Sequence, residues 1–131
     1  MASVPAHLST PRIGAVTVST ANTNRDGTGT IATVITAASA GTRILEVVVQ
    51  STGDPADGIV TLFLYDGSTY YLFDEIDHDN PAAGSTTVAA YRTSRTYQNL
   101  VLPSGWSLRA ACTVALTAGV YNVLAFGGDL T

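Results

Sequence analysis

The sequence predicts an all-β protein, an antiparallel β-sandwich of jelly-roll-like form with eight or nine strands and an extended N-terminal arm. Three observations support this fold class. Short stretches rich in β-branched and aromatic residues recur roughly 8–14 residues apart. Clusters of Gly, Asp, Asn and Pro separate these stretches. No window of about ten residues carries a helical period, and strings of short strands without helices fold as sandwiches or barrels.

The N-terminal arm is predicted over residues 1–12, which contain Pro5 and Pro11 and show no periodicity. Residues 13–131 are expected to form a single sandwich domain. Free chain ends fray unless something holds them, so we expect a neighbouring subunit to hold this arm. The candidate contacts in the arm are Val4, Pro5, Leu8, Pro11 and Arg12.

The strands are predicted from alternating polarity, because successive side chains of a strand point to opposite faces. In residues 43–51, for example, Leu45, Val47 and Val49 share one phase and are expected to share the buried face. The predicted strands cover residues 14–20, 30–37, 43–51, 59–65, 70–76, 87–93, 100–102, 106–114 and 120–126.

Turn chemistry separates these strands. Asp26 and Gly27 form the expected corner of the segment that joins the first two strands. The four residues from Asp66 to Thr69 predict a hairpin between the strands at 59–65 and 70–76.

The segment WSLRAACTV, residues 106–114, alternates without a phase error. Its apolar phase contains Trp106, Leu108, Ala110, Cys112 and Val114, and its other phase contains Ser107, Arg109, Ala111 and Thr113. We therefore expect one buried and one solvated face. Cys112 is the single cysteine, so no intrachain disulfide is possible, and its phase predicts a buried, inert thiol.

Composition limits the classes of partner. The apolar fraction of 46% is typical of a globular chain, whereas charged residues make up only 12%. A surface so poor in charge favours partner contact. The net charge of −4 argues against a nucleic-acid partner. No apolar run reaches the length of a membrane span and the start lacks the pattern of a secretion signal, so neither is expected.

Four of the ten acidic residues lie close together in the chain: Asp74, Glu75, Asp77 and Asp79, with His78 among them. Oxygen-rich clusters can hold Ca²⁺, but this spacing matches no EF-hand loop. The favoured interpretation is a solvated loop that protects a sheet edge, with no bound metal.

Catalytic motifs are missing from the sequence. His7 and His78 are the two histidines, and no Gly-x-Ser-x-Gly elbow presents a nucleophile to either. Neither a phosphate-binding Gly-Lys-Ser/Thr loop nor a Cys/His metal spacing occurs. We therefore expect a protein that is not an enzyme and that carries no cofactor.

Residues 91–97 interleave aromatic and basic side chains, with Tyr91, Arg92, Arg95 and Tyr97 as the candidate contact residues. Tyr and Arg are enriched where proteins bind proteins, and aromatic rings can also stack on bases or sugars. The acidic net charge favours a protein interface over nucleic acid.

The segments LVLPSGWSLRA (residues 100–110) and VYNVLAFGGD (residues 120–129) together resemble the ending of small jelly-roll virion proteins of tailed bacteriophages, often head decoration or cement proteins. This resemblance implies a structural protein on the exterior of the virion head, assembled in the host cytoplasm. It also implies the major capsid protein as partner, a homotrimer as the common assembly, and an arm that reaches a neighbouring subunit. Tail or neck placement stays open.

A second hypothesis is a carbohydrate- or receptor-binding β-sandwich module on a phage tail or fibre. Sandwiches with exposed tyrosines often hold sugars, and Tyr91 and Tyr97 are the candidate sugar contacts. Loss of glycan binding on their substitution by alanine distinguishes this module from a decoration protein.

Overall fold

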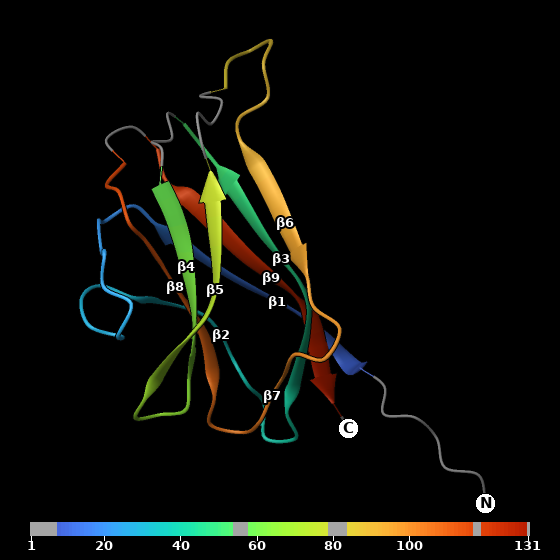
Figure 1. The fold of residues 1–131 in the computed structure, drawn as a ribbon. Coiled ribbons are helices and arrows are strands. Elements are labelled where there is room, and N and C mark those ends of the chain that lie inside the picture. Colours follow the sequence, from blue (N-terminus) through green and yellow to red (C-terminus); the bar gives the residue numbers. More distant parts are fainter. Residues whose placement is uncertain (1–7, 54–57, 79–83, 117–118, 131) are drawn as a thin grey trace, which may run out of the picture.

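The protein is a two-layered β-sandwich, as the sequence predicts (Figure 1). The computed structural model describes residues 8–53, 58–78, 84–116 and 119–130. The strands in these residues are β1 (Leu8–Val18), β2 (Ala32–Thr36), β3 (Thr42–Ser51), β4 (Gly58–Tyr65), β5 (Tyr70–His78), β6 (Arg92–Thr96), β7 (Val101–Leu102), β8 (Ser107–Cys112) and β9 (Tyr121–Leu130). No helix in the described part of the chain has the length and apolar character needed to cross a membrane.

The strand order is that of a jelly roll. One sheet has the order β1-β9-β3-β6, with the short β7 also paired to β3, and the other has the order β2-β8-β4-β5. All strand pairs in these sheets are antiparallel. Without β7, the first strand pairs with the last, the second with the last but one, and so on inward. This nested pairing confirms the predicted jelly-roll-like form.

The core lies between the two sheets. Val47, Val49 and Val123 of the first sheet are fully buried against Leu62 and Leu108 of the second. Close packing of β-branched and leucine side chains on two facing pleated surfaces is the expected interior of a sandwich.

The prediction that Leu45 shares the buried face of β3 is wrong. A β-bulge between Ile44 and Glu46 shifts the register of β3 against β9. Ile44 is therefore fully buried, while Leu45 is 41% exposed. A bulge adds one residue to a strand and so reverses the phase on one side of it.

The prediction of one solvated face on β8 is also wrong. Ser107 and Ala111 are each 2% exposed, and β8 ends at Cys112, so Val114 is exposed instead of buried. Cys112 itself is buried and free, as predicted, and burial raises the pKa of its thiol.

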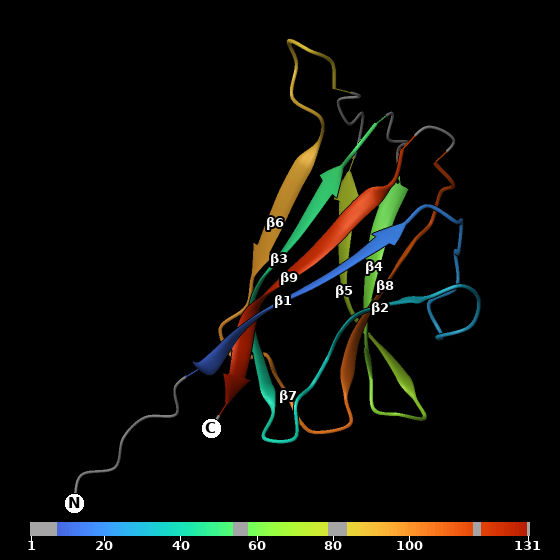
Figure 2. The same ribbon diagram turned by 180° about the vertical axis from the view of Figure 1, so that it is seen from behind.

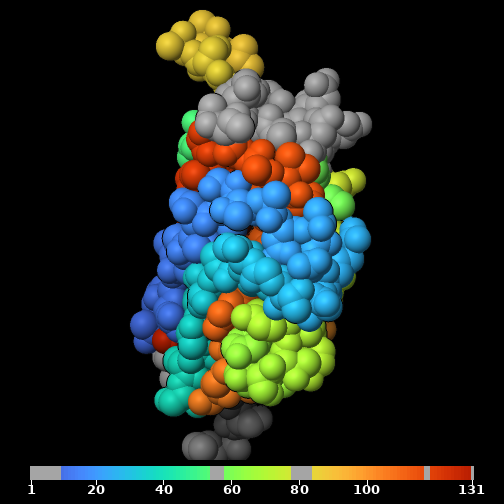
Figure 3. All heavy atoms as spheres, turned by 90° about the vertical axis from the view of Figure 1, so that its left-hand side faces the viewer, coloured from blue at the N-terminus to red at the C-terminus, as the bar shows by residue number. Residues whose placement is uncertain are grey.

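The cover on the second sheet comes from the segment between β1 and β2, residues 19–31. Arg25 of this segment forms an ion pair with Glu75 of β5, and the close approach at Gly27 leaves no space for a Cβ beside Tyr70. Figure 3 shows this blue segment lying against the lime hairpin of β4 and β5. Phe63 of β4 is fully buried, and its ring packs edge-on against Tyr70.

The predicted strand at 87–93 lies several residues too early, because β6 covers Arg92–Thr96. The hydroxyl oxygen of Ser85 accepts hydrogen bonds from the amides of Thr87 and Val88, and the Ser85 amide donates to the Val88 carbonyl. Local bonds of this kind hold a turn in spite of the β propensity of the Thr-Thr-Val run.

The inner boundary of the predicted arm is corrected as well. Residues 8–12 belong to β1 and pair with β9, from Leu8 opposite Leu130 to Arg12 opposite Gly127. The acidic residues from Asp74 to Asp77 lie in β5 and not in a loop. Val4, Pro5, His7 and Asp79 lie outside the described residues.

We expect Gly127→Ala to destabilise the protein by about 3 kcal/mol, because the added Cβ would overlap the backbone carbonyl oxygen of Arg43 in the β3–β9 pair. Gly58→Ala is the matched control. Its Cβ would lie 3.0 Å from a terminal methyl of Val114, which can move, so a change within about 1 kcal/mol is expected. Urea unfolding of both variants measures the difference, and equal losses would contradict the role given to the backbone contact.

Candidate interaction surface

The outer faces of the two sheets differ in their cover. Residues 19–31 contact the outer side of β5 through Arg25 and Gly27, whereas no described segment crosses in front of β1, β9, β3 and β6 in Figure 2. We call this second face the open face.

Register places three rows of side chains across the open face. Residues directly opposite one another in antiparallel strands point to the same side of a sheet. The rows, in the order β1, β9, β3 and β6, are Ile13–Phe126–Glu46–Thr96, Ala15–Leu124–Val48–Ser94 and Thr17–Asn122–Gln50–Arg92.

The open face is poor in charge and apolar along one side. Glu46 and Arg92 are the charged side chains in its three rows. Ile13 is 67% exposed, the largest value among the exposed large apolar side chains of the described residues. A shallow groove of about 320 Å³ runs beside it between β1 and β9, lined by Ala15 and Leu124 among others. Exposed apolar surface of this kind marks contact sites between proteins.

Arg12, a predicted contact of the arm, is bound inside the domain. Its guanidinium donates 2.8 Å to the Thr36 carbonyl and lies 3.2 Å from the Asp129 carboxylate. These bonds fasten β1 to β2 and to the end of β9. We therefore do not retain Arg12 among the residues proposed to meet a partner. Pro11 is exposed on β1, and Leu8 begins that strand.

The four candidate residues of the 91–97 strip come together on the edge strand β6 and its ends, but the two residue types differ in environment. Tyr91 and Tyr97 are half-buried and pack on the core, whereas Arg92 and Arg95 are exposed. The tyrosines close the seam between β6 and β5, the edge strands of the two sheets. Tyr91 donates 3.4 Å to the carbonyl of Asp77 on β5.

Tyr97 makes the stronger contact across this seam. Its hydroxyl donates 2.8 Å to Asp74 Oδ2, and its ring lies 5.0 Å from the ring of Phe73. Burial, together with the hydrogen bond to Asp74 and the charge of that carboxylate, raises the pKa of the Tyr97 phenol. Burial also raises the pKa of Tyr91. Tyr91 and Tyr97 therefore join the two sheets, in addition to any contact they make with a partner.

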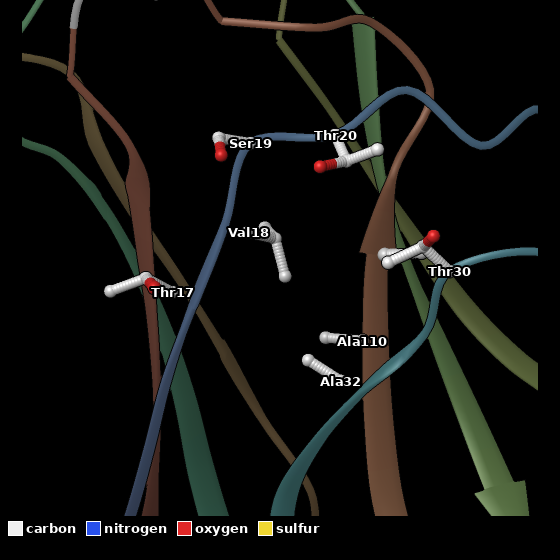
Figure 4. Close-up of a pocket in the computed structure, with 8 residues that line it drawn as sticks. Thr17, Val18, Ser19, Thr20, Thr30, Ala32 and Ala110 are labelled. Carbon is white, nitrogen blue, oxygen red and sulfur yellow. The ribbon is translucent and has the colours of Figure 1, made fainter.

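A small pocket lies between β1, β2 and β8. Figure 4 shows Val18, Ala32 and Ala110 pointing toward one another, with Thr20 and Thr30 beside them. Its volume is about 90 Å³, and none of its lining residues carries an ionisable side chain. Small-molecule sites typically enclose roughly 300–1,000 Å³, so this pocket does not fit a substrate.

Two of the three acidic residues of β5, Asp74 and Glu75, are bound to different partners. Asp74 accepts from Tyr97 and from the amide of Glu75, while Glu75 pairs with Arg25. Across the described residues, no three side chains from His, Cys, Asp and Glu converge in a way that could hold a metal ion.

The sequence contains an indication of the open face that is missed when each strand is expected to have one apolar phase. In residues 120–126 both phases are apolar, with Tyr121, Val123 and Ala125 in the core and Leu124 and Phe126 outside. A strand with two apolar phases has apolar surface on both sides of its sheet.

Comparison with known proteins gives one similar structure. No protein-family model matches the chain, and no curated protein matches it. Among solved structures it is similar to the crystal structure of a pentameric capsid protein isolated from metagenomic phage sequences, with 17% sequence identity and a TM-score of 0.40. The similarity covers 95% of this chain and 67% of that chain. A TM-score of 0.40 is too low to assign a family.

We expect Tyr97 to make the free energy of unfolding fall as the pH rises above about 10, in addition to the fall that the raised pKa of the buried Cys112 thiol begins at lower pH. An unfolded tyrosine titrates near pH 10, and the raised pKa of folded Tyr97 means that the native state keeps its proton longer. The stabilisation from protonated Tyr97 is present in full below about pH 10 and is lost as the pH rises through the raised pKa of the folded phenol. Tyr97→Phe should lower stability by about 1–2 kcal/mol at neutral pH and flatten the fall. Tyr71→Phe, which leaves Tyr97 intact, is the control and should keep the fall; urea unfolding from pH 7 to 11 measures both.

We expect calcium to leave the melting temperature unchanged, because the Asp74 and Glu75 carboxylates are bound to neighbours in the same chain and no three acidic, His or Cys side chains of the described residues converge. Thermal unfolding with several millimolar calcium and with a chelator tests this. A rise of several degrees with calcium would contradict the prediction.

Proposed function

We propose that this chain is a virion structural protein of a tailed bacteriophage, and specifically a head decoration or cement protein. In this role it binds the outside of the head shell, contacts the major capsid protein and acts as a homotrimer, without catalysing a reaction. The observation that carries the proposal is the open face, a charge-poor sheet surface with Ile13 standing out of it.

The open face suits docking for a physical reason. Bringing a charged surface against a partner costs free energy unless every charge is paired, whereas apolar side chains gain by leaving water. The rows formed by β1 and β9 contain Ile13, Ala15, Leu124 and Phe126 and no charged side chain. A partner that covers them buries apolar surface at little electrostatic cost.

The resemblance of residues 100–129 to small virion proteins supports the same role. These residues form β7, β8 and most of β9, so they include the central strand of the open face. The segment before Leu8, with Val4 and Pro5, is proposed to extend from the β1 edge to a neighbouring subunit.

The proposed mechanism is bridging. A rigid sandwich seated across two shell subunits raises the free energy needed to separate them. Stable interfaces bury on the order of 1,200–2,000 Å². Repetition around a symmetry axis adds avidity, so a trimer of weak contacts is held firmly.

We expect Ile13→Asp to weaken binding to purified head shells at least about tenfold, because it places an unpaired charge in the proposed contact. The side chain is 67% exposed, so the substitution should leave the fold intact. Val88→Asp is the matched control, since Val88 is 56% exposed but lies outside the open face.

Co-sedimentation of the purified protein with shells measures binding, and thermal unfolding checks both variants. Equal binding of Ile13→Asp and the unsubstituted chain would overturn the assignment of the open face. Failure of the unsubstituted chain to sediment with the shells would overturn the proposed function.

A further inference from the structure

A groove of about 360 Å³ lies where β5 meets the end of β6, away from the apolar side of the open face. Its lining residues are Phe73, Thr96, Tyr97, Gln98, Asn99 and Leu100. The volume is within the range of roughly 300–1,000 Å³ that small-molecule sites occupy. We call it the seam groove.

The aromatic wall of the seam groove is built from two rings. Phe73 and Tyr97 lie 5.0 Å apart with their planes at 46°. A register shift of β5 against β4 pairs Leu62 with Asp74 and Phe63 with Leu72, which leaves Phe73 at a bulge. Bulges redirect side chains and are common beside functional sites. The bond from the Tyr97 hydroxyl to Asp74 holds the second ring in place.

The polar side of the seam groove consists of two amides. Gln98 and Asn99 are exposed, and within the described residues neither side chain takes part in a hydrogen bond. Each amide group offers both donors and an acceptor. These two groups are free to bind a ligand that combines hydroxyl donors and acceptors.

The backbone that carries the amides is fixed from both sides. Arg43 Nη2 donates 2.7 Å to the carbonyl of Gln98. The amide of Tyr97 donates 2.9 Å to the Leu45 carbonyl, and the amide of Ile44 donates 2.9 Å to the Leu100 carbonyl. A site whose backbone is already ordered loses less entropy on binding.

We propose that the seam groove binds the ring of a neutral sugar. One face of a pyranose is apolar and fits against aromatic rings, while its hydroxyls match the amides of Gln98 and Asn99. No charged side chain lines the groove, and the nearby Asp74 carboxylate is already held by Tyr97 and the Glu75 amide. A charged ligand would therefore lose hydration without meeting an opposite charge among the side chains that line the groove.

This inference does not rest on the proposed function. The sequence predicts Tyr91 and Tyr97 as candidate sugar contacts. Tyr97 lines the seam groove and is kept, whereas Tyr91 does not line it and is excluded. The two proposals share Thr96, but the residues substituted in their tests differ, so each is tested without the other.

The experiment titrates the full, ¹⁵N-labelled chain with methyl glycosides of glucose, galactose, mannose and N-acetylglucosamine, followed by amide chemical shifts. At least one sugar should shift the signals of residues 96–100 and of Phe73, with a Kd on the order of millimolar. Gln98→Ala and Asn99→Ala should each weaken that sugar about fivefold, the effect of one hydrogen bond.

Asn24→Ala is the matched control, because Asn24 is an exposed amide in the segment before β2 and does not line the groove. It should bind as tightly as the unsubstituted chain. The proposal is overturned if none of the four sugars shifts the groove signals at about 100 mM, if the shifts lie elsewhere, or if a sugar acid such as glucuronate binds more tightly than every neutral sugar. Unchanged affinity in both amide variants would overturn it as well.

Discussion

The pairing of β9 between β1 and β3 is the constraint on which the rest of the structure depends. It joins the last described strand to the first, and it sets the register of the three rows on the open face. At Gly127 the backbones of β9 and β3 approach so closely that a Cβ has no space. The same strand supplies Val123 to the core and Leu124 to the outer surface. Core packing and the candidate docking surface are therefore coupled through one strand.

The two sheets differ in what covers their outer faces. The connection between β1 and β2 is long enough to reach the outside of the second sheet, where Arg25 pairs with Glu75 and Gly27 lies against Tyr70. The first sheet receives no such cover within the described residues. Removing apolar surface from water lowers the free energy, so an uncovered apolar sheet face favours contact with a partner. This asymmetry is why the proposed contact with the head shell is assigned to the open face.

The seam between β5 and β6 shows how a sandwich closes its free edges. Tyr91 and Tyr97 reach across to β5 and occupy a backbone carbonyl and a carboxylate there, which protects the edge from pairing with another chain. The same contacts hold the Tyr97 ring beside Phe73 and so shape the seam groove. Because β1 and β6 are opposite edges of one sheet, a partner on the β1–β9 side leaves this groove available.

Alternation and turn chemistry in the sequence determined the fold class, eight of the nine strands in outline, the hairpin at Asp66 and the burial of Cys112. They could not reveal the bulge that exposes Leu45, because a bulge depends on the partner strand. The position of β6 was also missed, since an edge strand of sequence RTSRT has no apolar phase. The burial of Ser107 and Ala111 on β8, the open face and the seam groove arise from residues distant in the chain. Only the tertiary structure decides them, because a local pattern reports how a side chain alternates and not what lies over it.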